Sequence, residues 1–432
     1  MPEAATASGD GGRRVSAESG HAVEWVEEEN YIFTPGRSED KLLQWLDGQG
    51  AAPGSSGCVV TPKERLHEVK AMLVKGSPHV SVSRPAARLS WGIPVPGDAS
   101  QTMYVWVDAL SSYLTGCKSA PGGAEGRWSS TVHFIGKDIL RFHAVLWPMF
   151  LTAAGHQPPS RIIAHGHWTV GKVKMSKSWG NVIDPVKLVD AVGVSAACYF
   201  MLREGGLSHD GEFDATLLLR RFNGELADTI GNLLSRCCAL ACKAGEHAVL
   251  LPCAFHAEDM RLMAAVNLRL HEAALLFNDA DFHKGLPLVF SAATDINKYL
   301  TTLQPWVVTK TDRQRALHIV YTALHCLRAV AALLSPVIPD AASQVAAAPL
   351  LPALGPLTPR LRPSVARRAR LSLAAPQRRA QPHGPYCPAG NCPPPLSACA
   401  LVTPSPQGRP PILFKKIEIN ALDDVVKAPV FT

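Results

Sequence analysis

In the first 185 residues, short apolar runs that suit buried strands alternate with longer stretches in which apolar residues recur at helical spacing. The pattern predicts a strand and turn at 21–33, helices at 38–49 and 61–74, a strand-rich run at 103–114 that passes directly into a helix, a strand at 132–136 followed by a helix to 155, and a strand at 161–170. Strands that alternate with helices are typical of a parallel sheet. We therefore predict an α/β domain at 21–185.

Beyond residue 184 the apolar spacing becomes helical throughout. Helices are predicted at 186–205, 214–245, 258–280, 281–302 and 313–335, and the later ones are expected to form an antiparallel bundle. We assign 186–213 to a connecting region and 214–340 to a helical domain.

The two ends of the chain lack these patterns. Residues 1–20 are predicted to be disordered. Residues 341–432 are rich in proline and arginine, show no period and contain no Asp or Glu between 341 and 417. We expect this tail to be disordered or to derive from a mispredicted exon.

Composition narrows the class of protein. With 432 residues, 47% of them hydrophobic and 18% charged, the chain is predicted to be globular. The apolar runs are short and interrupted, so we predict no membrane span, and no secretory signal is recognised. The net charge of +7 comes from the tail, which has eleven basic and three acidic residues. The rest carries 32 basic and 33 acidic residues, so any basic surface for nucleic acid must be local.

Eleven cysteines are scattered along the chain. Cys237, Cys238 and Cys242 lie in an apolar helical pattern, and Cys387 and Cys392 lie in the tail. We interpret them as buried thiols of a reducing compartment rather than as metal ligands or disulfides, and we predict no structural zinc.

The loop at 171–185 is the strongest chemical signal. Lys174 and Lys177, three residues apart and flanked by glycines, could bring two ammonium groups onto a polyphosphate; a solvated turn is the alternative. Asp138 follows a predicted buried strand, where an open α/β sheet binds ligands, and could accept hydrogen bonds from a ribose. His143, four residues after Ile139, would face the same cleft. Alternatively, Asp138 caps a helix and His143 is a core histidine.

Residues Lys174-Met175-Ser176-Lys177-Ser178 match, letter for letter, the second signature of class I aminoacyl-tRNA synthetases. The segments YVWVDALSSY (104–113) and HFIGKDILRFH (133–143) closely resemble the methionine-pocket segments of methionyl-tRNA synthetases. This resemblance implies a methionine pocket lined by Trp106, Ala109, Tyr113, Ile139 and His143. It implies ATP contacts from Gly136, Asp138, His165, Gly166, Lys174 and Lys177, with the two lysines catalytic. A core-packing role for Trp106 and Tyr113 is the alternative.

The helical half carries its own resemblance. IGNLLSR (230–236) places Asn232 and Arg236 four residues apart on one helix face, and Trp306 follows a predicted helix end. In the family, residues at these positions read and stack anticodon bases. Otherwise, Asn232 marks a bend in a buried helix and Trp306 belongs to the core.

The resemblance covers about residues 19–345 and implies the C-terminal half of a class I Rossmann-type nucleotide-binding domain, followed by an all-α anticodon-binding bundle. The connecting region 186–213 would contact the tRNA stem. The implied function is methionine–tRNA ligase of the mitochondrial/bacterial type, a monomer acting in the mitochondrial matrix on methionine, ATP with Mg2+ and tRNA(Met).

The first family signature, His-Ile-Gly-His or close to it, does not occur in the sequence. We therefore expect an N-terminally truncated form or an incomplete gene model that is weak or inactive in adenylate formation. The alternative function is an inactive fragment that binds tRNA through its helical domain. A class I synthetase for another amino acid is disfavoured by the pocket segments.

Overall fold

The computed structural model describes residues 5–7, 14–16, 27–36, 38–48, 58–74, 79–119, 128, 130–176, 180–243, 252, 254–346, 414–422 and 425. They belong to two bodies. The α/β body comprises Met1–Lys174, Gly205–Glu212 and Asn278–Ala280, and the helical body comprises Met175–Glu204, Phe213–Phe277 and Asp281–Thr432.

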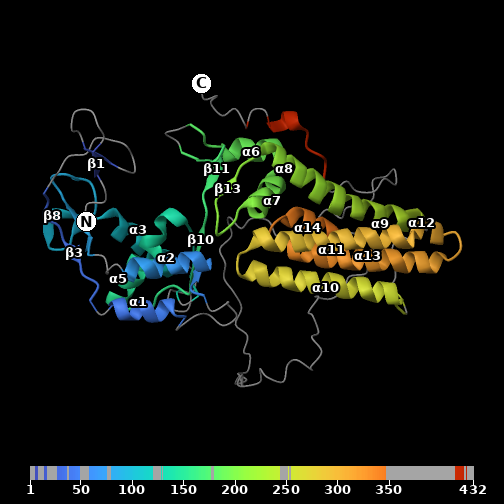
Figure 1. Ribbon diagram of the computed structural model, residues 1–432, viewed down its shortest axis with the longest axis horizontal. Coiled ribbons are helices and arrows are strands. Elements are labelled where there is room, and N and C mark those ends of the chain that lie inside the picture. Colours follow the sequence, from blue (N-terminus) through green and yellow to red (C-terminus); the bar gives the residue numbers. More distant parts are fainter. Residues whose placement is uncertain are drawn as a thin grey trace, which may run out of the picture. The chain divides into compact units, whose positions relative to one another are not determined.

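A parallel sheet forms the centre of the α/β body (Figure 1). Strand β10 (Arg161–His165) lies between β4 (Val60–Thr61) and β9 (Val132–Gly136) and is parallel to both. Buried side chains of these strands pack with α1 (Ser38–Leu46), α2 (Lys63–Val74) and the helical segments η2 (Phe142–Leu146) and α5 (Trp147–Ala153). The predicted parallel α/β sheet and the first two helices are confirmed.

Among the described residues, three small antiparallel sheets accompany the central one. They are β6 (Ser83–Pro85), β8 (Asp98–Met103) and β7 (Pro94–Val95); β3 (Ile32–Phe33) with β5 (Val80–Ser81); and β1 (Ala5–Ala7) with β2 (Arg14–Ser16). The last pair differs from the disorder expected for 1–20.

The run at 103–114 was assigned wrongly. Its strand ends at Met103, and α3 (Val105–Ser119) begins two residues later. The valines and aromatics of this run suit a strand, but their spacing places Trp106, Leu110 and Tyr113 on one helix face, where they join an apolar cluster.

The predicted strand at 161–170 is interrupted at Gly166. Beyond it, β11 (Trp168–Val170) joins a different sheet, in which it lies between β12 (Val173–Lys174) and β13 (Gly211–Glu212). The change of sheet places the hairpin that ends at Lys174 just beyond the carboxyl end of β10.

The helical body begins with two short helices. The predicted helix at 186–205 is divided into α6 (Pro185–Val192) and α7 (Val194–Glu204), which meet at an angle of 116°. Gly193 makes this bend possible because its φ of 82° lies in the left-handed region, which other residues rarely adopt.

The bundle follows. Helix α8 (Ala215–Arg221) continues through the π-helical η3 (Phe222–Gly231) into α9 (Asn232–Lys243). The later helices are α10 (Ala257–Asn278), α11 (Phe282–Leu303), α12 (Pro305–Val308), α13 (Arg313–Leu334) and α14 (Pro339–Ala346) (Figure 1). The predicted helices at 258–280, 281–302 and 313–335 are confirmed to within one or two residues.

Our prediction that no segment could span a membrane was too strong. By length and composition α13 could, since an 18-residue window reaches a mean hydropathy of 1.6. It packs against α9, α11, α12 and α14, and 61% of that window is buried inside the protein. Its apolar character is thus what a central bundle helix needs.

Part of the tail is packed, in contrast to the disorder expected for 341–432. Residues 414–418 and η5 (Ile419–Leu422) lie against α6, α8 and η3. Asn223 donates to the carbonyl of Ile417 (2.9 Å) and accepts from its N–H (3.0 Å), while Phe414 packs edge-on against Phe222. The tail therefore contributes a strap to the helical body.

Candidate functional site

An aromatic cluster lies between α3 and the segment that follows β9. The Trp106 ring stacks on Phe142 with centroids 3.9 Å apart, and Tyr113 lies one helical turn beyond Leu110 on the same face of α3. The Tyr113 hydroxyl lies 2.8 Å from His143 Nε2, and His143 Nδ1 lies 3.0 Å from the carbonyl oxygen of Ile139. A carbonyl can only accept, so Nδ1 carries the proton, and in a neutral ring Nε2 accepts from Tyr113.

Burial favours this neutral form of His143. Burial lowers the pKa of His143 from its ordinary value, and the Ile139 carbonyl offsets that effect only in part. The structure thus brings together Trp106, Tyr113, Ile139 and His143 of the predicted pocket. Ala109 is exposed on the same turn of α3.

Sequence reasoning missed the back wall of this pocket. His133 on β9 packs 4.4 Å from the Tyr113 ring, beside Trp128 and Trp147. Burial, together with the proximity of His143, lowers the pKa of His133 to about 4. His133 Nε2 and Trp147 Nε1 are buried without a hydrogen-bond partner among the described residues. The alternation of β9 was a signal for His133, since every second residue of the strand faces inward.

The carboxyl ends of β9 and β10 form a polar edge, where Gly136 pairs with His165. Asp138 follows β9, with Oδ2 3.7 Å from Lys174 Nζ and Oδ1 3.4 Å from His167 Nε2. Burial raises the pKa of Asp138, but the contact with His167 and the nearby Lys174 ammonium outweigh it, so the net pKa lies below its ordinary value. Asp138 is therefore an ionised acceptor, and it caps no helix: the cap residue of the 3-10 turn η1 (Lys137–Ile139) is Gly136.

Two glycines of this edge leave room for close neighbours. A Cβ on Gly136 would lie 2.6 Å from Asp138 Oδ1, and a Cβ on Gly166 would lie 2.2 Å from the backbone oxygen of His209. The Asp138 side chain could turn away, but the backbone at His209 could not, so only Gly166 allows an approach that any side chain would block.

The loop 205–212 completes the edge, and sequence analysis did not find it. Asp210 accepts from the His167 N–H (2.8 Å) and binds Lys137 Nζ (2.6 Å). Glu212 on β13 accepts from the N–H of Lys172 (3.1 Å). No pattern in the sequence links 205–212 to residues 137–172, so only the fold could reveal these contacts.

The lysine loop belongs partly to this edge. Lys172 has a φ of 64°, which turns the hairpin, and Lys174 at its end is 57% exposed beside Asp138. Lys177 lies outside the described residues. In the helical body, the buried Asn181 accepts from the Ser176 N–H (2.8 Å), and Asp184 caps α6.

A second candidate site lies in the helical body. The Arg236 guanidinium on α9 lies 5.7 Å from the centre of the Trp306 ring on α12, and Arg236 Nη1 donates to Asn297 Oδ1 on α11 (3.3 Å). Asn232 is exposed and Trp306 is 42% exposed, so Trp306 is not the core residue of the alternative interpretation. Asn297 is a member of this group that sequence reasoning missed.

The thiols of α9 differ from one another. Cys237 and Cys238 are buried and Cys242 is exposed. Burial raises the pKa of both buried thiols, that of Cys238 to about 11. Among the described residues, no group of three or more His, Cys, Asp or Glu side chains could hold a metal ion.

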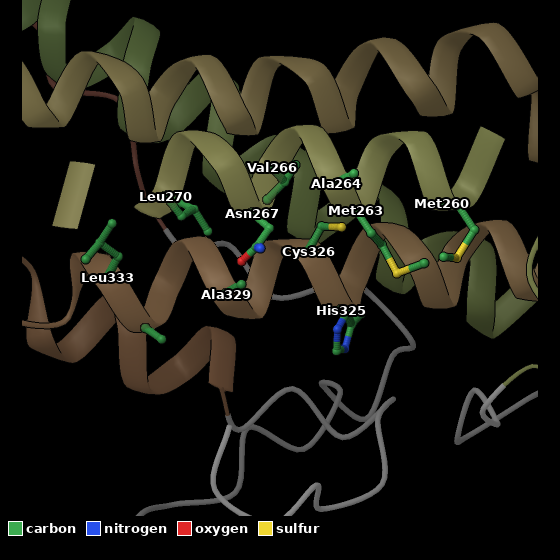
Figure 2. A pocket seen from close by; sticks show the side chains of 11 residues that line it. Met260, Met263, Ala264, Val266, Asn267, Leu270, His325, Cys326, Ala329 and Leu333 are labelled. Atoms are coloured by element: carbon green, nitrogen blue, oxygen red, sulfur yellow. The ribbon is translucent and has the colours of Figure 1, made fainter. Parts of the chain in front are cut away.

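An apolar groove of about 720 Å3 lies between α10 and α13, as Figure 2 shows. Met263 and Leu270 contribute from α10, and Cys326 and Leu333 from α13. None of the residues predicted from the sequence lines it.

Comparisons with known proteins identify related sequences. Residues 13–238 match the family model "tRNA synthetases class I (M)", and residues 252–352 match "Anticodon binding domain of methionyl tRNA ligase". The chain is 38% identical over 341 residues to a probable mitochondrial methionine–tRNA ligase of Dictyostelium discoideum, with 76% of the chain and 58% of the relative covered. It is 39% identical over 348 residues to the mitochondrial methionine–tRNA ligase of Bos taurus, with 77% and 58% covered.

A solved structure is also similar. The methionyl-tRNA synthetase of Mycobacterium tuberculosis in complex with methionyl-adenylate superposes with a TM-score of 0.70 at 36% identity, covering 78% of this chain and 66% of that one. The chain thus spans about 58% of the length of these curated relatives. Because the first family model alone matches more than half of the chain, the protein belongs to the class I (M) tRNA synthetase family.

Proposed function

We propose that the chain acts as a methionine–tRNA ligase. It would join methionine to ATP as methionyl-adenylate with release of pyrophosphate, and then transfer the methionyl group to the terminal ribose of tRNA(Met). One observation carries the proposal: residues 136–143 hold both the ionised Asp138 of the polar edge and the neutral His143 of the aromatic cluster. A nucleotide bound at Asp138 and a small apolar amino acid bound at His143 would therefore lie next to each other, because both contact residues 136–143.

The pocket suits a thioether. Trp106, Ala109, Tyr113, Ile139 and His143 would line it, and sulfur packs favourably against aromatic ring edges. A neutral His143 places no positive charge in the pocket. The uncharged methionine side chain therefore does not have to displace an anion, or water, that a charged ring would bind.

The polar edge suits a nucleotide. Asp138 would accept hydrogen bonds from the ribose, and Gly136, His165 and Gly166 would lie against the nucleoside. The methionine carboxylate would attack the α-phosphorus, and the bond to pyrophosphate would break. Lys174, together with Lys177, would neutralise the charge that develops on the phosphate oxygens. Mg2+ would enter with ATP as part of the substrate.

The helical body would bind the anticodon. The exposed Trp306 offers a stacking surface for a base, while Asn232 and Arg236 offer hydrogen-bond donors beside it. We further propose a monomer acting in mitochondria, in line with the mitochondrial relatives.

The test is methionine-dependent exchange of pyrophosphate into ATP by the purified chain. We expect exchange that is weak but above the methionine-free background, and we expect Lys174→Ala to reduce it by about 100-fold. Lys172→Ala is the matched control, because this lysine contributes its backbone N–H to the fold and lies on the same hairpin. It should leave exchange unchanged.

Measuring binding of tRNA(Met) beside the exchange separates the two functions. Binding of tRNA(Met) without any exchange would refute the ligase and support a protein that only binds tRNA through its helical body. Exchange driven equally by another amino acid would refute the methionine pocket.

A further inference from the structure

His133 is a buried ring that takes no part in the proposed contacts with methionine or ATP. It lies on β9 and is 4% exposed, whereas Val132 and Phe134, on the other face of the strand, are 41% and 67% exposed. In the parallel sheet His133 pairs with Ile162 of β10. Because β9 is paired with β10 along its whole length, the backbone that carries this ring is held firmly in place.

The ring nearest to His133 is that of Tyr113. Their centroids lie 4.4 Å apart with the planes inclined by 57°, whereas the rings of His143 and Trp128 lie 5.8 and 6.2 Å away. The Tyr113 hydroxyl in turn lies 2.8 Å from His143 Nε2. Since the two rings pack closely, the bulk of His133 limits how far Tyr113 can retreat from His143.

Packing alone does not explain a histidine at this position. His133 Nε2 is buried without a hydrogen-bond partner among the described residues, and an unpaired buried nitrogen carries a cost in free energy that an apolar side chain avoids. Burial, followed by the proximity of His143, lowers the pKa of His133 to about 4, so the ring is neutral near pH 7. Histidine instead offers shape, because imidazole is the smallest flat ring among the side chains. Leucine is not flat, and phenylalanine is larger.

We infer that His133 is a positioning residue that sets how long a side chain the proposed methionine pocket accepts. The inference rests on that proposed pocket. His133 acts through Tyr113 and His143, the two pocket residues against which it packs. A smaller residue at position 133 lets Tyr113 move back and lengthens the pocket, and a larger ring pushes Tyr113 forward and shortens it.

The test compares three amino acids by isothermal titration calorimetry with the full chain. They are methionine, ethionine, which is one methylene longer, and norvaline, which is one atom shorter. We expect the unaltered chain to bind methionine most tightly. In His133→Ala the ratio of the Kd for ethionine to the Kd for methionine should fall by about tenfold, the lower end of what one methylene contributes in an apolar pocket. In His133→Phe this ratio should rise, and the ratio of the Kd for norvaline to the Kd for methionine should fall.

A second measurement needs no ligand. The nitrogen chemical shift of His143 Nε2 is sensitive to the hydrogen bond that this atom accepts from Tyr113. In His133→Ala the shift should move toward that of a ring nitrogen without a donor, because Tyr113 is no longer held in place.

Phe134→Ala is the matched control, because it truncates the next residue of β9 on the opposite, exposed face. It should leave the Kd ratios and the His143 shift unchanged. Equal loss of affinity for all three amino acids in His133→Ala, or an unchanged His143 shift, would overturn the inference alone. If His133→Ala does not unfold cooperatively in urea, His133→Asn, which keeps a smaller flat group, tests the same direction of change. Failure of the unaltered chain to bind methionine would overturn the methionine pocket, and the inference with it.

Discussion

The replacement Gly166→Ala tests the architecture of the nucleotide edge most directly. The added methyl carbon would lie 2.2 Å from the His209 carbonyl oxygen and 2.8 Å from its carbon, where ordinary contact begins near 3.4 Å. The obstacle is backbone, so the chain itself must move by about 1 Å. Overpacking of this kind costs about 1–3 kcal/mol.

The displacement of the backbone should also impair function. The loop that must move carries Asp210, which holds Lys137 and the His167 N–H. A displacement of about 1 Å at a site that positions reactants can cost about 100-fold in rate. We therefore expect Gly166→Ala to lower the urea midpoint of the α/β body and to weaken ATP binding together.

Gly116→Ala is the matched control. Gly116 lies within α3, and a Cβ there meets nothing within 4 Å. Because alanine favours a helix over glycine, this variant should be more stable by about 0.5–1 kcal/mol. Urea unfolding followed by tryptophan fluorescence and equilibrium binding of ATP measure both variants. If Gly166→Ala matched the unaltered chain in midpoint and affinity, the close approach of residues 166 and 209 would be refuted.

Three further predictions concern other parts of the molecule. Trp306→Ala should weaken binding of an RNA hairpin with the methionine anticodon CAU by about 1–3 kcal/mol in an anisotropy titration, whereas Trp306→Phe should retain most of the affinity; equal loss in both would argue against stacking. Asp259→Asn should destabilise the helical body by about 3–5 kcal/mol in urea unfolding, because it removes the buried carboxylate that binds Arg315 through two hydrogen bonds. Burial raises the pKa of Asp259, but hydrogen bonds from Arg315 and Tyr299 outweigh it and leave the pKa below its ordinary value. The stability that the ionised Asp259 contributes should therefore be present above about pH 4 and be lost as the pH falls further. In the folded protein His133 has a pKa of about 4, so it binds a proton less readily than in the unfolded chain. The stability of the α/β body should therefore fall as the pH drops from about 6.5 toward 4, and His133→Asn should make stability less dependent on pH in this range. An unchanged pH dependence in the variant would contradict a buried neutral histidine.

The local features of this protein follow from its sequence. Apolar spacing predicted α10, α11 and α13 to within two residues, since a helix that buries one face must repeat its apolar residues every three or four positions. The pocket segments grouped Trp106 with Tyr113 by resemblance, although their run was predicted as a strand, and Ile139 and His143 lie one turn apart. Which residues share a face of one helix or strand follows from the number of residues per turn or per repeat of that element.

The sequence pattern predicted the wrong secondary structure where one run of residues suits both a strand and a helix. The run at 103–114 has the residues of a strand and the spacing of a helix, and packing against Leu151 and Trp147 decided for the helix.

Contacts between distant segments were decided by tertiary structure alone. Asp210 reaches Lys137 across 73 positions, and Arg161 reaches Asn278 across 117. Such pairs leave no periodic trace, because their spacing depends on how many residues the intervening elements happen to use. The sequence by itself determined which residues could bind a nucleotide, a small apolar side chain and RNA. The fold determined which of them meet, because only packing of the sheet and the bundle brings the ends of separate elements to one place.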